Sequence, residues 1–159
     1  MAENPKCLLV VRIRGVIDAP GDVKDTLKML NLKRNNHAVI IRDTPSYRGM
    51  LQKAQNYITW GEPTENTVVE LIKKRGRLLG DKKITDDYAK KVGFKSVEDL
   101  AKAVFEGKVD YGKLPEIKPF FRLHPPSKGF KGKIKKSYKM GGETGYRGEA
   151  INQLIERMI

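Results

Sequence analysis

Residues 7–14, with the sequence CLLVVRIR, begin as a continuous apolar run and end in an alternation of apolar and basic side chains. The first pattern is typical of a central strand covered on both faces, and the second of a strand end that reaches solvent. A β-branched run follows at residues 37–42, and the period of two returns at residues 57–60. These three segments predict the strands of a small sheet.

Helical patterns separate the three segments. Asp22 follows a Pro-Gly turn and is a candidate N-cap, and apolar residues at 23, 27 and 30 then form one helical stripe. Thr44-Pro45 predicts the start of a second helix, with apolar residues at 47, 51, 54 and 58. Gly49 inside this helix costs about 1 kcal/mol relative to alanine. We therefore expect another backbone to approach it closely.

Strand, helix, strand, helix, strand predicts an α+β fold: a ferredoxin-like sandwich core over residues 1–63, with a three-stranded or larger sheet and helices on one face. A helix after the candidate cap Asn66 opens a helical extension over residues 64–113. Prolines and glycines predict an irregular basic loop over residues 114–148. Apolar residues at 151, 154, 155 and 158 predict a C-terminal helix within residues 149–159 that docks on the core.

The charge of the chain indicates an anionic partner. The 159 residues include 32 Lys and Arg against 19 Asp and Glu, a formal net charge of +13. Nucleic acid and anionic membrane are the usual partners of such a chain. The excess lies in two patches, because residues 118–139 hold eight basic and no acidic residues, and residues 27–63 hold six basic against two acidic. No apolar run is long enough to span a membrane, and the absence of a secretory signal pattern favours the cytoplasm.

The basic segment 118–139 is the stronger candidate for RNA binding. Cations along a chain interrupted by glycine and proline can follow a curved phosphate backbone, and an aromatic ring can stack on an exposed base. The alternative is a mobile, solvated run of charge. The candidate residues are Arg122, Lys128, Lys131, Lys133, Lys135, Lys136, Tyr138 and Lys139.

The second patch combines an expected helix-to-strand loop with the second helix. Arginine suits phosphate because its planar fork donates two hydrogen bonds. Ordinary surface charge is an equally good explanation for this patch. Its candidate RNA-binding residues are Lys33, Arg34, Asn35, Arg42, Arg48 and Lys53.

Catalytic, metal and cofactor sites are not indicated by the sequence. A single cysteine, Cys7, in an apolar strand, and two histidines far apart, His37 and His124, offer little for metal chemistry. Residues 141–148 are glycine-rich and precede a helix, but they lack the Gly-Lys-Ser/Thr ending of a phosphate-binding loop. They suit a linker or a backbone contact to RNA. A small phosphatase, which ferredoxin-like folds can host, and a membrane-surface binder remain the rival functions.

Two stretches resemble one known family. Residues 30–50, LNLKRNNHAVIIRDTPSYRGM, resemble the signature of the large-subunit ribosomal protein L-thirty family, whose eukaryotic counterpart is ribosomal protein seven of the large subunit. Residues 140–158 are also similar to that family. Bacterial members resemble only the first 60 or so residues, so residues 64–159 indicate the archaeal and eukaryotic branch. A first strand that begins by Cys7 leaves no long basic extension, which favours the archaeal form.

This resemblance implies a ferredoxin-like core that binds large-subunit ribosomal RNA near the 5S RNA, beside other ribosomal proteins. It implies a cytoplasmic, ribosome-bound protein without catalysis, cofactor, membrane or small-molecule substrate. For single residues, it implies that Lys33, Arg34 and Arg48 face RNA and that Gly49 serves packing.

Overall fold

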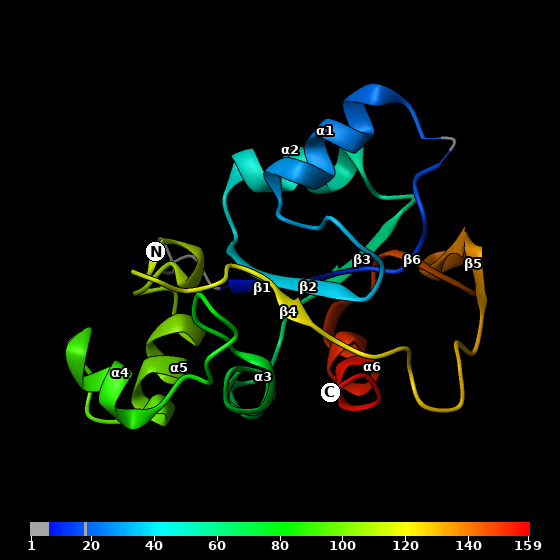
Figure 1. Ribbon diagram of the computed structural model, residues 1–159. Coiled ribbons are helices and arrows are strands. Elements are labelled where there is room, and N and C mark those ends of the chain that lie inside the picture. Colours follow the sequence, from blue (N-terminus) through cyan, green and yellow to red (C-terminus); the bar gives the residue numbers. More distant parts are fainter. Residues whose placement is uncertain (1–6, 18) are drawn as a thin grey trace, which may run out of the picture.

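The computed structural model describes residues 7–17 and 19–159 (Figure 1). One sheet has the strand order β4-β2-β1-β3-β6-β5. Its strands are β1 (Cys7–Arg12), β2 (His37–Arg42), β3 (Ile58–Gly61), β4 (Phe121–Arg122), β5 (Lys133–Ser137) and β6 (Gly142–Tyr146). The α-helices are α1 (Gly21–Met29), α2 (Pro45–Lys53), α3 (Glu65–Arg75), α4 (Asp86–Lys91), α5 (Val97–Phe105) and α6 (Ile151–Glu156), and the 3-10 turns are η1 (Tyr111–Lys113), η2 (Tyr138–Met140) and η3 (Gly148–Ala150).

β1 is the central one of the three strands predicted from the sequence. It pairs antiparallel with both β2 and β3, with Leu9 opposite Ile40 on one side and Gly61 on the other. Leu8 and Val10 belong to one buried cluster and Leu9 to the other. Apolar side chains therefore point to two cores from one strand, which is why residues 7–11 show no polar alternation.

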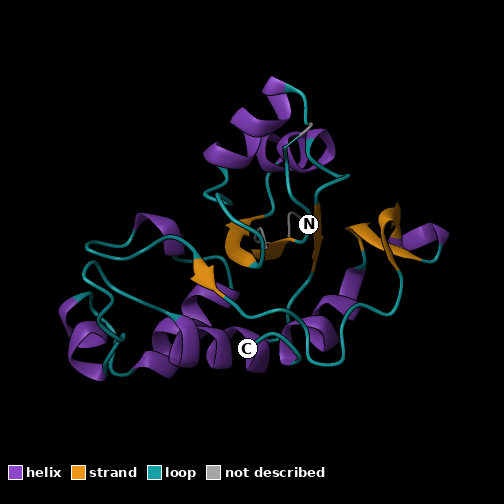
Figure 2. Ribbon diagram, turned by 45° about the vertical axis from the view of Figure 1, so that its right-hand side comes forward, coloured by secondary structure: helices purple, strands orange, loops and turns teal. Residues whose placement is uncertain are grey.

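α1 and α2 cover one face of the sheet, as Figures 1 and 2 show. Leu27 and Leu30 pack there with Leu51, which confirms the predicted stripe of the first helix. The second stripe is shorter than expected, because α2 ends at Lys53 and Ile58 belongs to β3. The oxygen of Thr44 accepts a hydrogen bond from the backbone N–H of Tyr47, which confirms the predicted cap of α2. The N-cap prediction for α1 is wrong: the helix begins at Gly21, and Asp22 lies in its first turn.

The opposite face of the sheet is covered by the C-terminal part of the chain (Figure 2). Leu71 and Ile72 of α3, Leu100 of α5 and Ile155 of α6 are fully buried in a second cluster. The cap of α3 is Thr64, whose hydroxyl accepts from the N–H of Thr67, so the expectation for Asn66 is wrong. The fold is thus α+β, with a ferredoxin-like core and an extension that covers the face left open by α1 and α2.

Residues 114–148 were expected to form an irregular loop, and this expectation is wrong, because they contain three strands. β4 adds to β2 at one edge of the sheet. β6 adds in parallel to β3 at the other edge, and β5 adds in parallel to β6. Glycines weaken the local strand signal, and the backbone of an already formed sheet supplies the missing hydrogen-bond partners.

The expected close approach of another backbone to Gly49 is also wrong, because no neighbouring atom lies within 4 Å of the position that a Cβ would occupy. It is an exposed residue in the middle of α2. We expect Gly49→Ala to raise the free energy of unfolding by about 0.5–1 kcal/mol, since alanine has less conformational freedom to lose on folding. Urea denaturation of both proteins measures this difference. A loss of stability would show that Gly49 has a packing role after all.

Candidate nucleic-acid interface

We call residues 127–141 the basic arm. Its six lysines are all exposed. Within the described part of the chain, the ion pairs closer than 4.0 Å involve none of them. They are therefore free to meet an external anion. The six are Lys128, Lys131, Lys133, Lys135, Lys136 and Lys139.

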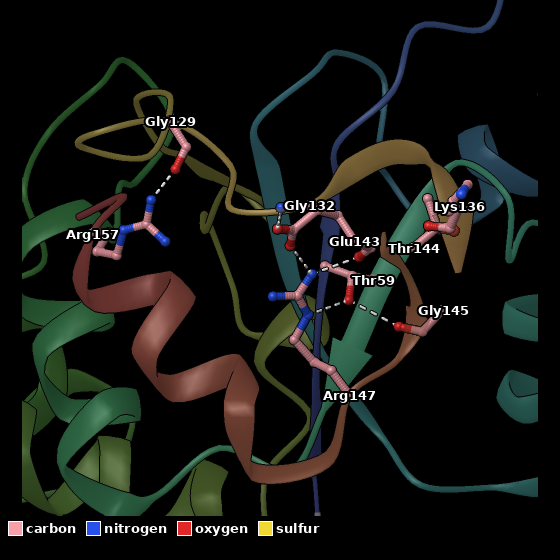
Figure 3. A network of polar contacts seen from close by, with 9 residues as sticks. All are labelled: Thr59, Gly129, Gly132, Lys136, Glu143, Thr144, Gly145, Arg147 and Arg157. Carbon is pink, nitrogen blue, oxygen red and sulfur yellow. Dashed lines mark hydrogen bonds and ion pairs between the residues drawn. The ribbon is translucent and has the colours of Figure 1, made fainter. Parts of the chain in front are cut away.

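The basic arm is held against β6 by specific contacts (Figure 3). The backbone N–H of Gly132 donates to the Glu143 carboxylate at 2.8 Å, and the Thr144 hydroxyl donates to the carbonyl of Lys136 at 3.1 Å. A Cβ on Gly142 would lie 2.0 Å from that same carbonyl oxygen, so only glycine permits this approach. The arm thus consists of a strand and a turn, with hydrogen bonds to β6.

A buried polar network fixes β6 to β3 beneath the arm (Figure 3). The Arg147 guanidinium donates to Thr59 Oγ1 at 2.7 Å, to a Glu143 carboxylate oxygen at 2.7 Å and to the Glu143 carbonyl at 2.5 Å. The Thr59 hydroxyl in turn donates to the carbonyl of Gly145 at 2.8 Å. The side chains of Arg147 and Glu143 are 5% and 7% exposed. Such a pair is tolerated in the interior because each charge is neutralised and hydrogen-bonded.

The sequence did not reveal these network residues, because residues 141–148 were expected to form a linker or a backbone contact to RNA. The available signal was a Glu and an Arg four residues apart among glycines, which is weak without knowledge of the sheet. Arg147 also lies 5.0 Å from the ring centroid of Tyr138. Tyr138, predicted to stack on a base, thus already has a cation partner, although 41% of the residue is exposed.

Arg157, at the end of α6, fastens the start of the basic arm. Its guanidinium donates to the carbonyl of Ser127 at 2.9 and 3.1 Å and to the carbonyl of Gly129 (Figure 3). The end of the C-terminal helix therefore positions the start of the arm, and β6 positions the rest of it.

Arg122 belongs to a different surface from the lysines of the arm. It lies in β4, at the edge of the sheet opposite β5. There it is paired across from His37, beside the loop that carries Lys33, Arg34 and Asn35, all three exposed. The structure thus brings Arg122 together with the second patch, and we call Lys33, Arg34, Asn35 and Arg122 the loop cluster.

Arg12 stabilises the loop that carries this cluster. Its buried side chain donates to the carbonyl of Leu32 at 3.2 Å and to that of Arg14 at 3.1 Å. The N–H of Asn36 donates to the carbonyl of Arg12 at 2.8 Å. A buried arginine of the central strand therefore sets the position of the exposed basic residues.

The remaining residues of the second patch are not part of the loop cluster. Arg42 lies at the other end of β2, where its guanidinium is 3.4 Å from the carbonyl of Lys108. Arg48 forms an ion pair with Asp43, and the Lys53 amine is 3.6 Å from the Asp22 carboxylate. Arg42, Arg48 and Lys53 are thus separated from the loop, and Arg48 and Lys53 each have a carboxylate partner at the surface.

His37 is a buried residue of β2, and its ring stacks on Phe120 with 4.8 Å between the ring centroids. Burial lowers its pKa, and the nearby positive charges of Arg122, Arg34 and Arg12 lower it further. The folded protein therefore holds this imidazole neutral at pH 7.

The free energy of unfolding should depend on pH through His37. Its folded pKa lies below the ordinary value of about 6.5, so the unfolded chain binds the proton first as the pH falls. Stability contributed by neutral His37 is full above pH 6.5 and declines below it, with a slope of at most about 1.4 kcal/mol per pH unit. Urea denaturation between pH 7.5 and 5 measures the decline. His37→Gln should remove it, and an identical slope in that variant would contradict the assignment.

In residues 7–17 and 19–159, no three His, Cys, Asp or Glu side chains gather as a metal site. No helix in the same ranges is long and apolar enough to cross a membrane.

Comparison with known proteins identifies the family. The model of the family described as ribosomal protein L30p/L7e matches residues 8–58. "Large ribosomal subunit protein uL30" of Nanoarchaeum equitans is 54% identical, over 94% of this chain and 97% of its own. Its namesakes from Staphylothermus marinus and Methanobrevibacter smithii are 50% and 51% identical, over 98% and 95% of this chain and 99% of theirs. These matches extend over 94–98% of the chain, and the chain belongs to the uL30 (L30p/L7e) family of ribosomal proteins.

Proposed function

We propose that this protein is a structural constituent of the large ribosomal subunit, which binds and stabilises folded ribosomal RNA and so supports translation. The observation that carries the proposal is the basic arm, an ordered segment with six exposed lysines and no ion pair to them within the described chain. The names of the relatives, all large-subunit proteins, support the same function.

The arm suits phosphate contacts because hydrogen bonds to β6 give it a defined conformation. Lys133 and Lys135 are two residues apart on β5 and project to the same side, whereas Ile134 between them packs on the core. An ordered segment loses less conformational entropy on binding than a mobile one. Phosphate contacts would supply most of the affinity, and the shape of the folded RNA would supply selectivity.

Within this proposal, the chain has four parts: a core over residues 1–63, a helical extension over 64–113, an RNA-binding segment over 114–148 and a docking helix over 149–159. The loop cluster and the arm lie at opposite edges of one sheet, so the protein would bridge two RNA segments. We further propose a position near the 5S RNA, contacts with neighbouring ribosomal proteins and a cytoplasmic, ribosome-bound location. These three points rest on the family resemblance.

The test is the salt dependence of binding to large-subunit ribosomal RNA. If about eight phosphates are neutralised, log K should fall against log salt with a slope of roughly −6 to −7. Filter binding of the purified protein between 50 and 300 mM salt measures it, and a slope shallower than about −2 would contradict the proposal. Preferential cosedimentation with anionic vesicles would instead favour a membrane-surface protein, and turnover of acyl phosphate would favour an enzyme.

A further inference from the structure

A cavity of about 380 Å³ opens between α2, β3 and β6, directly beside the basic arm. Its apolar lining comes from Leu8, Leu51 and Trp60. Lys139 of the arm contributes to its rim, so the cavity and the arm form one continuous surface. The size is within the range of pockets that bind small organic groups.

Tyr146 presents an aromatic ring at this cavity. It is 44% exposed, although its ring lies 6.4 Å from that of Trp60 at a tilt of 53°. Its hydroxyl donates to the Glu62 carboxylate, 2.6 and 2.8 Å from the two oxygens. The preceding residue, Gly145, is held by the buried Thr59 (Figure 3). The ring is therefore fixed at both ends while a large part of it stays accessible.

The Tyr146 phenol, neutral at pH 7 even with an ordinary pKa of about 10, is shifted further from ionisation by its surroundings. The hydrogen bond to this carboxylate, with burial and the negative charges of Glu62 and Asp43 as further causes, raises the pKa of Tyr146 to about 12. The phenol remains a donor and the ring remains uncharged throughout the physiological range. An uncharged aromatic face is the surface on which a nucleobase stacks.

The charges around the cavity balance, in contrast to those of the arm. Arg48 pairs with Asp43, with 2.6 Å between its Nη2 and a carboxylate oxygen, and Glu62 and Lys139 add one charge of each sign to the lining. Because two carboxylates and two cations line the cavity, a phosphate inside it would gain little net attraction. A flat, neutral group attached to an anionic chain satisfies both surfaces, with the group in the cavity and its flanking phosphates on the arm. The side-chain amide of Gln52 is at hand for polar atoms on its edge.

We propose that this cavity holds one unpaired nucleobase of the bound RNA, stacked on Tyr146, with the neighbouring phosphates on Lys139 and the basic arm. Recognition of a base turned out of its helix and stacked on an aromatic side chain is a common way for proteins to bind folded RNA. The inference rests on the proposed RNA-binding function and adds to it a subsite that distinguishes bases from phosphates.

The fluorescence of Trp60 tests this subsite directly, because the chain has one tryptophan and it lines the cavity. Two probes of equal charge are compared: a single-stranded oligoadenylate of eight nucleotides, and a ribose-phosphate octamer without bases. Anisotropy of end-labelled probes measures their affinities. The oligoadenylate should bind more tightly and quench Trp60, whereas the octamer without bases should bind through its phosphates without quenching.

Two variants separate stacking from the hydrogen bond to Glu62. Tyr146→Phe loses that bond and keeps the ring, so oligoadenylate affinity should change by less than about threefold, because the phenyl ring still supplies the stacking surface. Tyr146→Leu should reduce it by roughly 5- to 150-fold, which corresponds to the loss of one stacked base, and leave the affinity of the octamer without bases unchanged. Thermal unfolding verifies that both variants are folded, and the comparison of probes on the unchanged protein needs no variant.

Equal affinity and equal quenching for the two octamers would overturn the base subsite, and so would the absence of any quenching. Quenching by adenosine monophosphate at the affinity of the oligoadenylate would also overturn it, because phosphates on the arm would then add nothing. None of these results would alter the salt dependence of binding to ribosomal RNA. A shallow salt slope would instead contradict the proposed function itself.

Discussion

Replacing Lys131, Lys133, Lys135 and Lys136 together by glutamine is expected to weaken binding to large-subunit ribosomal RNA roughly 100- to 1,000-fold at 0.15 M salt. Each phosphate contact releases bound counterions, and four lost contacts should also make the salt slope shallower by about 3. The same substitutions should leave the melting temperature nearly unchanged, because these side chains are exposed and form no ion pair within the described residues. Filter binding and calorimetry measure the two effects.

The helical extension offers a matched control for this variant. It carries exposed lysines that also have no ion pair closer than 4.0 Å in the described ranges. Replacing four of them removes the same total charge from a surface that we do not assign to RNA, so affinity should fall less than about tenfold. The four are Lys82, Lys90, Lys95 and Lys102. Equal losses in the two variants would mean that net charge, and not the arm, determines binding.

Arg147→Met is expected to lower the free energy of unfolding by about 3–5 kcal/mol, the usual cost of removing one partner of a buried ion pair. The Glu143 carboxylate, 7% exposed, would keep its charge without its cation, and the hydroxyl of Thr59 would lose a donor. Because this network joins β6 to β3, the arm should also loosen, with a weaker affinity for RNA. Urea denaturation measures the first effect.

A double variant separates the ion pair from the space that it fills. Replacing both Glu143 and Arg147 by methionine removes the uncompensated charge, so part of the lost stability should return. If Arg147→Met alone cost less than about 1 kcal/mol, water would have replaced the guanidinium, and the network would not hold the arm.

Much of the candidate interface could be located from the sequence, but the sequence did not show that its residues lie on two separate surfaces. The run of cations in residues 118–139 is visible without any structure, since charge density depends only on composition. The assignment of Arg122 to the same surface as Lys133 was wrong, because β4 and β5 occupy opposite edges of the sheet. Neighbours in sequence were separated by strand order, which no local pattern records. The buried positions of His37 and Arg147 depend on the same pairing.

The sequence by itself determined the central strand, the two helices that follow it and the need for a polyanionic partner. Those features depend on the period of apolar residues and on net charge, which are properties of short segments and of composition. Only the tertiary structure decided that residues 142–146 form a strand and that the lysines beyond Gly132 stand on an ordered arm. The physical reason is that a glycine-rich segment has no strand preference of its own, and it became β6 because the exposed edge of β3 offered hydrogen bonds and a buried threonine.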